Sequence, residues 1–571
     1  MHPPYRAMLN LTVRNPHPRA TEHLTKAGIP PLLARLYAAR GIQDSQQIRH
    51  TLHQLEPYGS LMQIDAAATR LADAIARQEK ILVVADYDAD GATACALATA
   101  GLRALGAQVS WLVPNRFDDG YGLTAEIVNQ AAQHAPQILL TVDNGIAAFE
   151  GVAEAQRRGI EVIVTDHHLP GETAPDTLIV NPNQKGCAFP SKNLAGVSVA
   201  FYVVMATRAE LRRRGAFAQQ AEPPLGDLLD LVALGTVADV VKLDDNNRLL
   251  VDAGLRRIRA GQGRPGINAL FRAAGRDPLR ASAMDLGFTI GPRLNAAGRL
   301  ADMGLGVACL LAPDDATAMT LAHELDRLNR ERREIEADMQ AQAVAILDRL
   351  DINAQRMTLI LFDPNWHQGV IGLLASRIKE RHHRPTLVFA EAGDGWIKGS
   401  GRSVPALHLR DALDQVDRRH PGLIARFGGH AAAAGLTLRR EDLDTFSAAF
   451  EAIAHETMSA SDLERIIETD GALSPTERHL DNARLLRNAV WGQGFPAPTF
   501  LGDFTVQSQR LVGSKHLRLR LLADGLQHDA ILFNHDQALP DRIRAVYRME
   551  VNEFNGSTTL QLGIEHWSAL S

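Results

Sequence analysis

Short apolar segments alternate with helix-like segments between residues 80 and 170. Four runs rich in Val, Ile and Leu are separated by stretches such as ATACALATAGLRALG and AAFEGVAEAQRRG, which place apolar residues at helical spacing. Strands that alternate with helices in this way form a parallel sheet with helices on both faces. The sequence therefore predicts a doubly wound α/β domain with strands ILVVAD (81–86), VSWLVP (109–114), QILLTVD (137–143) and EVIVTD (161–166).

The remaining chain predicts further domains, as its length of 571 residues requires. Residues 314–350 are helical in pattern, highly charged and free of Gly and Pro, which is typical of a helix that bridges domains. A second α/β unit follows, with strands at 357–363 and 385–390, and alternating segments at 516–523 and 558–567 indicate a small β barrel. We expect an N-terminal extension (1–64), a first α/β domain (65–310), a connecting helix (311–350), a second α/β domain (351–464) and a β domain (465–571).

Composition and charge indicate a cytoplasmic globular protein. The net charge of −6 excludes a uniformly basic nucleic-acid binder, so any polyanion site must be a local basic patch. The three cysteines lie far apart, which favours a reducing compartment and no structural zinc. The polar, Pro-rich start is unlike a signal peptide, and no apolar run is long enough to span a bilayer, so no membrane partner is expected. The domain count suits a monomer.

Acidic residues stand at the carboxyl ends of three predicted strands, where sites form in parallel sheets. They occur in DYDAD (86–90), in TVDNGI (141–146) and in the triplet Asp166-His167-His168. A further acid, Asp239, ends the predicted buried helix at 225–241. Carboxylates that converge in one crevice repel one another unless cations neutralise them. Oxygen ligands with one or two imidazoles suit Mn²⁺ or Mg²⁺ better than Zn²⁺, and so many ligands indicate two ions that share a carboxylate.

Each of these residues also has a structural interpretation. An Asp after a strand commonly caps a helix or forms a turn, and a His pair in a loop is commonly just exposed. The DxDxD spacing could belong to a calcium loop, although the downstream Gly and Glu of an EF-hand are missing. The joint pattern is much less expected by chance than any one member.

Nine motifs carry a resemblance to known enzymes. ADYDADGAT, VPNRFDDGYGL, TVDNGI, TDHHLP and LVALGTVADVV, in this order, resemble the motif set of the DHH phosphoesterase superfamily. GPRLNAAGR (291–299), WHQGVIGLLASRI (366–378), KGSGRS (398–403) and GGHAAAAG (428–435) resemble the RecJ family of single-strand-specific 5′→3′ exonucleases. The resemblance implies a DHH catalytic domain, a DHHA1 domain and a C-terminal oligonucleotide-binding (OB) barrel, acting in DNA recombination and repair.

The resemblance also implies a two-metal site and its residue roles. Asp143 would bridge the ions, His168 would contact the scissile phosphate, and Asp166 would orient a neighbouring histidine. The ions would activate water for in-line attack on phosphorus. How DYDAD divides its three acids between the ions stays open. The implied metal ligands are Asp86, Asp88, Asp90, Asp143, His167 and Asp239.

The phosphate-binding residues are expected in basic and Gly-rich motifs, because glycine lets backbone N–H groups approach an oxyanion and Arg forms a fork for phosphate. The resemblance also implies a clamp on the terminal phosphate in the second α/β domain, which would explain end-dependence and polarity, and a narrow cleft, which would explain the preference for single strands. Taken singly, each Arg could instead be a surface ion-pair residue. The candidates are Arg116, Arg293, Asn295, Arg299, Ser400, Arg402 and His430.

For the C-terminal domain the resemblance implies a barrel that feeds single-stranded DNA inward. LVGSKHLRLRLL offers Lys515, His516, Arg518 and Arg520, with Phe533 and Phe554 as candidate stacking rings, although the same alternation fits any half-exposed strand. The GNPxP-like turn of the family stands here as GQGFPAP (492–498), with Phe495 as the departure. The partners implied are single-stranded DNA, a helicase and a single-strand-binding protein.

Two other functions compete with the exonuclease. Other members of the superfamily hydrolyse short oligonucleotides or phosphoadenosine phosphate, but they are typically shorter and lack the long helix and the β domain. Relatives of this fold also serve as replication scaffolds after losing metal ligands, whereas here every acid and the DHH triplet are present.

Overall fold

The computed structural model describes residues 10–48, 51–115, 122–348, 356–513, 515–554 and 556–570. The chain forms two compact units: the first comprises Met1–Arg327 together with Glu468–Ser571, and the second comprises Leu328–Ile467. In the described part of the chain, no helix combines the length and the apolar character needed to cross a membrane.

The first unit contains the predicted doubly wound sheet. Its five strands are all parallel, in the order β3-β2-β4-β5-β6. The four predicted strands are confirmed, and the sheet gains β6, a three-residue strand too short to give a periodic signal. The strands are β2 (Lys80–Ala85), β3 (Gln108–Leu112), β4 (Ile138–Val142), β5 (Glu161–Thr165) and β6 (Leu178–Val180).

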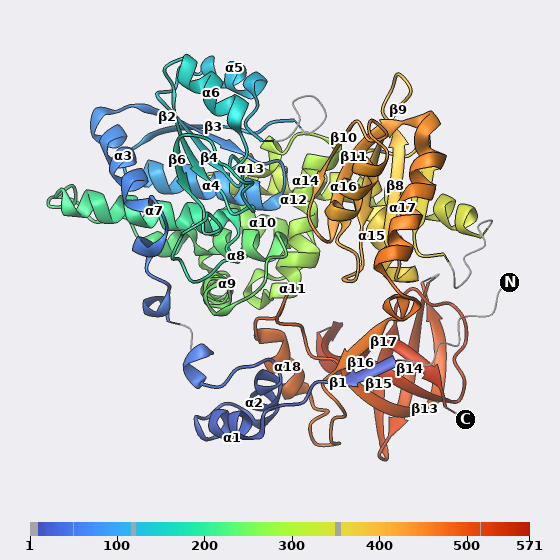
Figure 1. Ribbon diagram of the computed structural model, residues 1–571. Coiled ribbons are helices and arrows are strands. Elements are labelled where there is room, and N and C mark those ends of the chain that lie inside the picture. Colours follow the sequence, from blue (N-terminus) through green and yellow to red (C-terminus); the bar gives the residue numbers. More distant parts are fainter. Residues whose placement is uncertain are drawn as a thin grey trace. The chain divides into compact units, whose positions relative to one another are not determined.

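Helices cover both faces of this sheet (Figure 1). On one face, α5 (Ala125–Ala132) and α6 (Phe149–Arg157) pack against the strands through a buried cluster that includes Leu82, Val84 and Val164. On the other face lie α4 (Ala89–Ala104) and α7 (Gly196–Arg213). Because both faces are covered, the central strands are continuously apolar.

Helices complete the first unit around this sheet. The helix expected over 225–241 consists of a 3-10 turn at Leu225–Leu228 and the buried helix α8 (Leu229–Ala238), whose C-cap is Asp239. Other helices include α1 (Pro18–Lys26), α2 (Pro31–Ala38), α3 (Ile64–Arg77), α9 (Asp245–Arg257), α10 (Pro265–Ala273), α12 (Gly291–Leu300) and α13 (Gly304–Leu310). The connecting helix is α14 (Asp315–Leu347), which runs from the first unit into the second.

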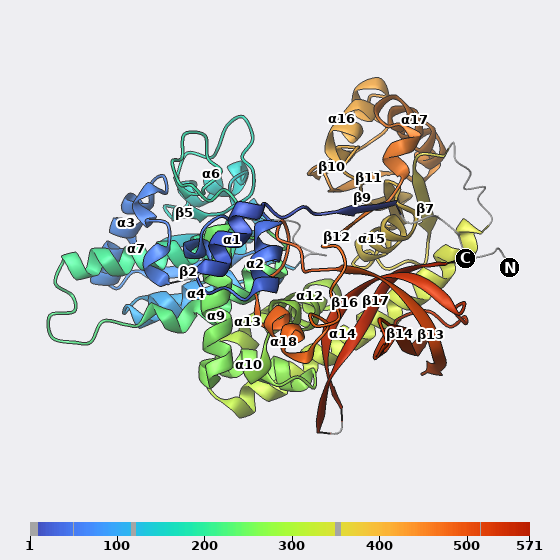
Figure 2. The ribbon, with the colours of Figure 1, turned by 90° about the horizontal axis from the view of Figure 1, so that it is seen from below.

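The first unit also contains the predicted C-terminal barrel. Five strands close in the order β13-β14-β15-β17-β16, and Figure 2 shows them in red. The alternating segments at 516–523 and 558–567 lie in β14 and β17, as expected. The strands are β13 (Phe500–Val512), β14 (His516–Ala523), β15 (Leu526–Leu532), β16 (Arg542–Phe554) and β17 (Ser557–Ala569).

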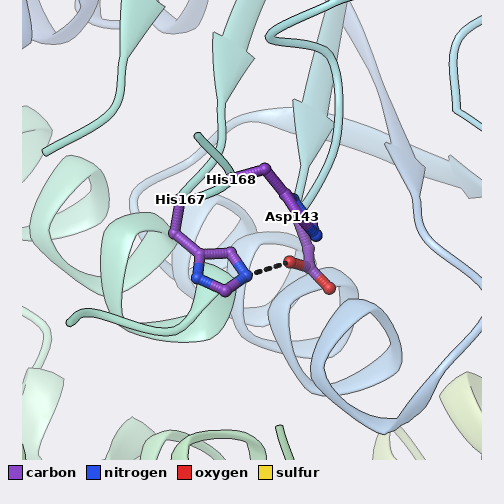
Figure 3. A group of neighbouring side chains, drawn as sticks. All are labelled: Asp143, His167 and His168. Carbon is purple, nitrogen blue, oxygen red and sulfur yellow. Dashed lines mark ion pairs between the residues drawn. The ribbon is translucent and has the colours of Figure 1, made fainter. Parts of the chain in front are cut away.

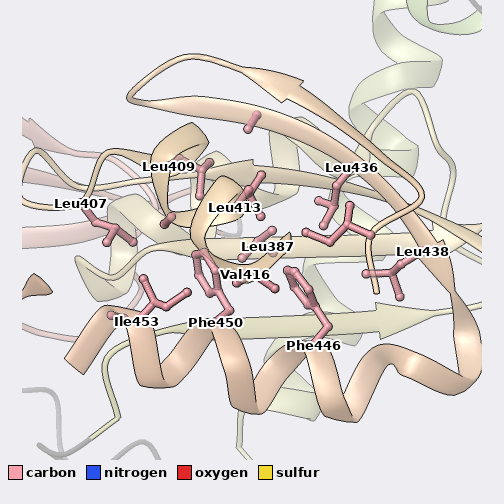
Figure 4. Packing of buried hydrophobic residues seen from close by; sticks show 14 of the residues in the cluster. Leu387, Leu407, Leu409, Leu413, Val416, Leu436, Leu438, Phe446, Phe450 and Ile453 are labelled. Carbon is pink, nitrogen blue, oxygen red and sulfur yellow. The ribbon is translucent and has the colours of Figure 1, made fainter. Parts of the chain in front are cut away.

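The second unit is a mixed α/β fold. Its sheet has the order β10-β11-β9-β8-β7, in which only β7 (Leu359–Asp363) and β8 (Thr386–Glu391) are parallel. These two strands were predicted, whereas the antiparallel strands β9 (Trp396–Arg402), β10 (Arg426–Gly429) and β11 (Ala433–Arg439) were not. The helices are α15 (Ile371–His382), α16 (Leu409–Arg419) and α17 (Leu443–Thr457). Figure 4 shows Phe446 and Phe450 of α17 packed with Leu413, Leu436 and other buried side chains.

Candidate metal centre

The predicted acidic residues gather at the carboxyl edge of the parallel sheet. Asp143 follows β4 and has a left-handed backbone, with φ of 62°, a conformation that is uncommon for a non-glycine residue and clusters at functional sites. Asp86 follows β2, Asp88 and Asp90 begin α4, Asp166 to His168 follow β5, and Asp239 ends α8. Parallel strands bring these carboxyl ends together, as the sequence predicted.

The side chains form three overlapping groups of possible metal ligands. In each group, one ligand atom per residue lies within 4.8 Å of the others. Asp143 and His167 each belong to two groups, so they connect the cluster. Figure 3 shows the His167 ring pointing at Asp143, with 3.1 Å between Nε2 and Oδ1. The groups are Asp86 with Asp88 and Asp143, Asp90 with His167 and Asp239, and Asp143 with His167 and His168.

Three buried atoms in this cluster have no hydrogen-bond partner among the described residues: Asp143 Oδ1, His167 Nε2 and Asp239 Oδ2. Such atoms cost free energy when they are buried unless something else satisfies them. Nε2 of His167 lies 3.5 Å from Oδ2 of Asp239, so the three atoms face one another. Hard oxygen ligands and a neutral imidazole are the donors that Mn²⁺ and Mg²⁺ accept, and the residues therefore fit these ions.

The pKa values reflect the same crowding. Burial, and then the charge of Asp90, raises the pKa of Asp143 well above its usual range. Burial and the neighbouring Asp88 raise the pKa of Asp239 to about 7. Burial and His168 lower the pKa of His167 to about 4, which leaves a neutral ring able to bind a metal. Without cations the cluster takes up protons, and bound cations would replace those protons.

Asp88 and Asp90 also hold the backbone around the site. The structural interpretation applies to Asp88, because its Oδ1 caps α4 by accepting the N–H groups of Asp90 and Gly91 at 2.9 and 3.0 Å. Asp90 is fully buried and accepts the N–H groups of Gly196 and Val197 at 2.6 and 3.0 Å. Each carboxylate has lone pairs left for a metal.

Asp166 faces away from the shared centre and organises the His pair. Its Oδ1 accepts the backbone N–H groups of His167 and His168, at 2.7 and 3.1 Å, and lies 2.7 Å from His168 Nδ1. Its Oδ2 accepts the N–H of Ile146 at 2.9 Å. Burial opposes a charged His168, but the hydrogen bond with Asp166 outweighs it and raises the pKa of His168 to about 9. His168 is therefore a cation at neutral pH, which suits contact with a phosphate better than metal binding.

Comparison with known proteins agrees with this arrangement. Residues 80–236 match the DHH family N-terminal domain, residues 353–456 the DHHA1 domain and residues 469–566 the RecJ OB domain. The single-stranded-DNA-specific exonuclease RecJ of Dickeya dadantii is 52% identical over 94% of this chain and 96% of its own, and that of Escherichia coli is 49% identical over 95% and 96%. This chain belongs to the RecJ family.

Solved structures of the RecJ family agree with the fold and with the metals. RecJ of Thermus thermophilus in complex with Mn²⁺ superposes with a TM-score of 0.82 at 31% identity, covering 99% of this chain and 80% of that one. The complex of the same protein with Mg²⁺ gives a TM-score of 0.76 at 29% identity. The candidate metal centre thus has the donor set for the ions found in RecJ structures.

Two of the candidate phosphate-binding residues of this RecJ chain contact other residues within the protein. Arg293 is buried and donates through Nε to Asp326 at 3.0 Å and through Nη1 to the carbonyl of Thr289 at 2.6 Å. Asn295 accepts the N–H of Ala89 at 2.9 Å, so it fastens α12 to the start of α4. The phosphate role of these two residues and of Arg299 stays a prediction, and Arg116 lies outside the described residues.

In the second unit, the KGSGRS and GGHAAAAG motifs lie at one end of the sheet. Strand β9 pairs with β11, so that Arg402 lies opposite Ala433 and Ser400 opposite Gly435. Nη1 of Arg402 donates to Ser400 Oγ at 3.3 Å, and no ion pair of Arg402 occurs among the described residues. A Cβ at Gly372, in the first turn of α15, would lie 2.9 Å from Ser400 Oγ. Ser400, Arg402 and a helix N-terminus therefore meet, which is a favourable setting for phosphate. His430 stands in the turn before β11.

Two residues that the sequence reasoning missed position the His pair. Nδ2 of Asn181 donates to the carbonyl of His168 at 2.9 Å, and Nδ2 of Asn183 donates to the carbonyl of His167 at 2.5 Å. Both belong to the NPN turn that follows β6. That turn is visible in the sequence, but nothing local indicates that it folds back onto the loop after the preceding strand, β5.

Proposed function

We propose that this chain is a metal-dependent exonuclease that degrades single-stranded DNA from the 5′ end by two-metal hydrolysis of phosphodiester bonds, in recombination and repair. The observation that carries this proposal is the group of buried ligand atoms on Asp143, His167 and Asp239, which face one another and make no hydrogen bond within the described chain. It occurs in a chain whose relatives over nearly its full length are named single-stranded-DNA-specific exonucleases. The 5′→3′ direction extends the family resemblance.

We assign a role to each side chain of the centre. Bound Mn²⁺ or Mg²⁺ would activate water for in-line attack and neutralise charge on the phosphoryl oxygens. Asp143 connects two ligand groups and is assigned as the bridging carboxylate. His168, held as a cation by Asp166, directs its remaining ring N–H toward an oxygen of the scissile phosphate. The proposed metal ligands are Asp86, Asp88, Asp90, Asp143, His167 and Asp239.

We assign to the second unit the residues that set the direction of degradation along the DNA strand. Ser400, Arg402 and the N-terminus of α15 would bind the terminal 5′-phosphate, with His430 from the neighbouring turn. Burial lowers the pKa of Arg402, and no carboxylate within the described chain offsets this cost. An anionic ligand would therefore stabilise the buried guanidinium charge, which suits Arg402 to this role. Arg116, Arg293, Asn295 and Arg299 remain candidates for phosphates further along the strand.

The barrel would contribute to binding of the strand that enters the site. Phe533 is 51% exposed, and its ring lies 5.2 Å from His516 in an edge-to-face arrangement, so this pair can stack with bases. Arg518 and Arg520 lie 3.8 and 3.4 Å from Asp529, which offsets part of their charge. Lys515 and the His516–Phe533 pair are therefore better placed for DNA than the two arginines.

One gel tests the exonuclease. The purified protein is incubated with Mn²⁺, Mg²⁺ or chelator, and with single-stranded or blunt duplex DNA labelled at either end. We expect the 5′ label to leave at once as very short product and the 3′-labelled strand to shorten gradually, only on single strands and only with metal. Asp143→Ala should be inactive, and the helix-capping variant Asp44→Asn should match the wild type. Turnover of dinucleotides or phosphoadenosine phosphate without cleavage of DNA would instead place the protein in the small-substrate class.

The proposal includes a cytoplasmic monomer that works beside a helicase and a single-strand-binding protein. Light scattering should give a mass near 62.1 kDa, and a dimer would contradict this part. The domain limits expected from the sequence are supported by the three family matches, each of which lies inside one proposed domain. Limited proteolysis should cut near residues 350 and 465 if those limits are correct.

A further inference from the structure

The GQGFPAP turn, whose Phe495 departs from the family pattern, packs against the segment that follows Asp239. The turn connects α18 (Leu480–Asn488) to the barrel strand β13. The carbonyl of Gln493 accepts the N–H of Leu243 at 2.8 Å. Residues about 250 positions apart in the sequence are therefore hydrogen-bonded beside a proposed metal ligand.

Two glycines of the turn allow this close approach. A Cβ at Gly492 would lie 2.7 Å from Cδ1 of the buried Leu243. A Cβ at Gly494, where φ is +70°, would lie 2.5 Å from Cγ of Lys242. Cβ atoms essentially never come so close to other atoms, so the turn and residues 242–243 have no room between them.

Phe495 completes the contact from the other side. Its ring is 3% exposed and stacks on Trp491 at 5.4 Å between ring centroids. The guanidinium of Arg248 lies 4.3 Å above the Phe495 ring, and its Nη1 donates to the carbonyl of Leu243 at 3.0 Å. Both backbone polar groups of Leu243 are thus held, one by the turn directly and one by an arginine that rests on the turn.

The segment held in this way is short and strained. Three residues separate Leu243 from Asp239. The first of them, Val240, has φ of +63°, a strained conformation for a β-branched residue that persists only where the surroundings impose it. Oδ2 of Asp239 makes no hydrogen bond among the described residues and lies 3.5 Å from Nε2 of His167, so a shift of the Asp239 backbone would change this separation.

The same segment reaches a second part of the metal centre. Nδ2 of Asn247 donates to the carbonyls of Lys242 and Asn193, at 2.9 and 2.6 Å. Oδ2 of Asp244 accepts Nδ2 of Asn193 at 3.0 Å. Three residues further along, the N–H of Gly196 donates to Asp90 at 2.6 Å. Displacement of residues 242–247 would therefore disturb two proposed ligands.

We propose that the turn Trp491–Pro496 is a positioning element of the metal centre, which holds Asp239 in place through Leu243 and Arg248. This inference rests on the proposed assignment of Asp239 as a metal ligand. It gives the turn a function within the reaction, in addition to its place in the link between α18 and the barrel.

The test is Gly492→Ala, which adds one methyl group against Leu243. We expect Mn²⁺ affinity, measured by calorimetry on the full-length protein, to fall about 10-fold or more, as for other residues that orient metal ligands. Hydrolysis of single-stranded DNA should fall at low Mn²⁺ and recover at high Mn²⁺. The matched control is Gly226→Ala, because a Cβ there meets nothing within 4 Å. Phe495→Leu provides a second variant that removes the support of Arg248 without adding volume.

A double-variant cycle separates positioning from general stability. In an Asp239→Asn background, Gly492→Ala should reduce Mn²⁺ affinity by a smaller factor than it does in the wild type, because part of its effect acts on the ligand already removed. If Gly492→Ala and Phe495→Leu lower the unfolding temperature but leave Mn²⁺ affinity unchanged, the turn is merely structural and the inference is wrong. Wild-type protein that binds Mn²⁺ but leaves DNA intact would refute the exonuclease instead, and the affinities would still decide the role of the turn.

Discussion

Replacing Asp143 by Asn should make the metal-free protein more stable while it destroys the metal centre. Asn keeps the size of the side chain and removes its charge. The Asp143 carboxylate is 2% exposed, lies within 4.8 Å of ligand atoms on Asp86 and Asp88, and has an oxygen without a hydrogen bond in the described chain. The charge is useful only when a cation is present, so its removal should stabilise the apoprotein.

The magnitude follows from these separations. At an effective dielectric constant of about 20, two unit charges 4.8 Å apart repel by about 3.5 kcal/mol. Proton uptake by Asp143 and the loss of its contact with His167 reduce this gain. We therefore expect the free energy of unfolding of Asp143→Asn to exceed that of the wild type by roughly 1 to 3 kcal/mol in chelator at pH 8. For a cooperative unit of about 250 residues, the size of the expected domain 65–310, this raises the unfolding temperature by about 2 to 6 °C.

Addition of Mn²⁺ should shift the difference in stability between the two proteins by about 2.3 kcal/mol in favour of the wild type. At a Mn²⁺ concentration 100 times the wild-type Kd, binding stabilises the wild type by about 2.7 kcal/mol. Loss of the shared ligand should weaken binding about 100-fold, so the same Mn²⁺ concentration stabilises Asp143→Asn by only about 0.4 kcal/mol. Calorimetric unfolding scans in chelator and across a Mn²⁺ titration measure both numbers, with Asp44→Asn as the control for an Asp-to-Asn change outside the cluster.

Two results would refute this reasoning. If Asp143→Asn unfolds at a lower temperature than the wild type in chelator, the carboxylates are not in electrostatic conflict. If Mn²⁺ stabilises both proteins equally and the variant still cleaves DNA, Asp143 is not a shared ligand.

Three further predictions concern other parts of the chain. Arg402→Ala should weaken binding of 5′-phosphorylated single strands about 10-fold or more, with Mn²⁺ affinity unchanged; reduced Mn²⁺ affinity would contradict the clamp. Burial, with a contribution from the charge of Glu565, raises the pKa of Glu550 above 4.5. In thermal scans, Glu550→Gln should therefore become more stable than the wild type as the pH rises through 4.5, and the two proteins should be equally stable below about pH 4. Arg40→Ala removes two hydrogen bonds from the buried Asp470 and leaves it only the longer ion pair with Arg14 at 3.4 Å, so it should cost about 3 kcal/mol in urea unfolding.

Much of the fold and the core of the site could be predicted from the sequence. The strands of the first sheet are short apolar runs between amphipathic helices, and such patterns are local. The fold then brings Asp86, Asp143 and Asp166 together, because parallel strands end at one edge. The antiparallel strands β9 to β11 escaped prediction, since WIKGSGR and AAGLTLR are rich in glycine and small residues, which weaken a local strand pattern.

What the sequence by itself determined is therefore the set of chemical groups and the edge of the sheet where they meet, because periodicity and strand ends are encoded by neighbouring residues. Only the tertiary structure decided how those groups divide their roles. It bound Arg293 to Asp326 and placed Gln493 against Leu243. These two contacts join segments that lie 33 and 250 positions apart in the sequence. No local pattern records such partners, because they depend on how buried elements pack.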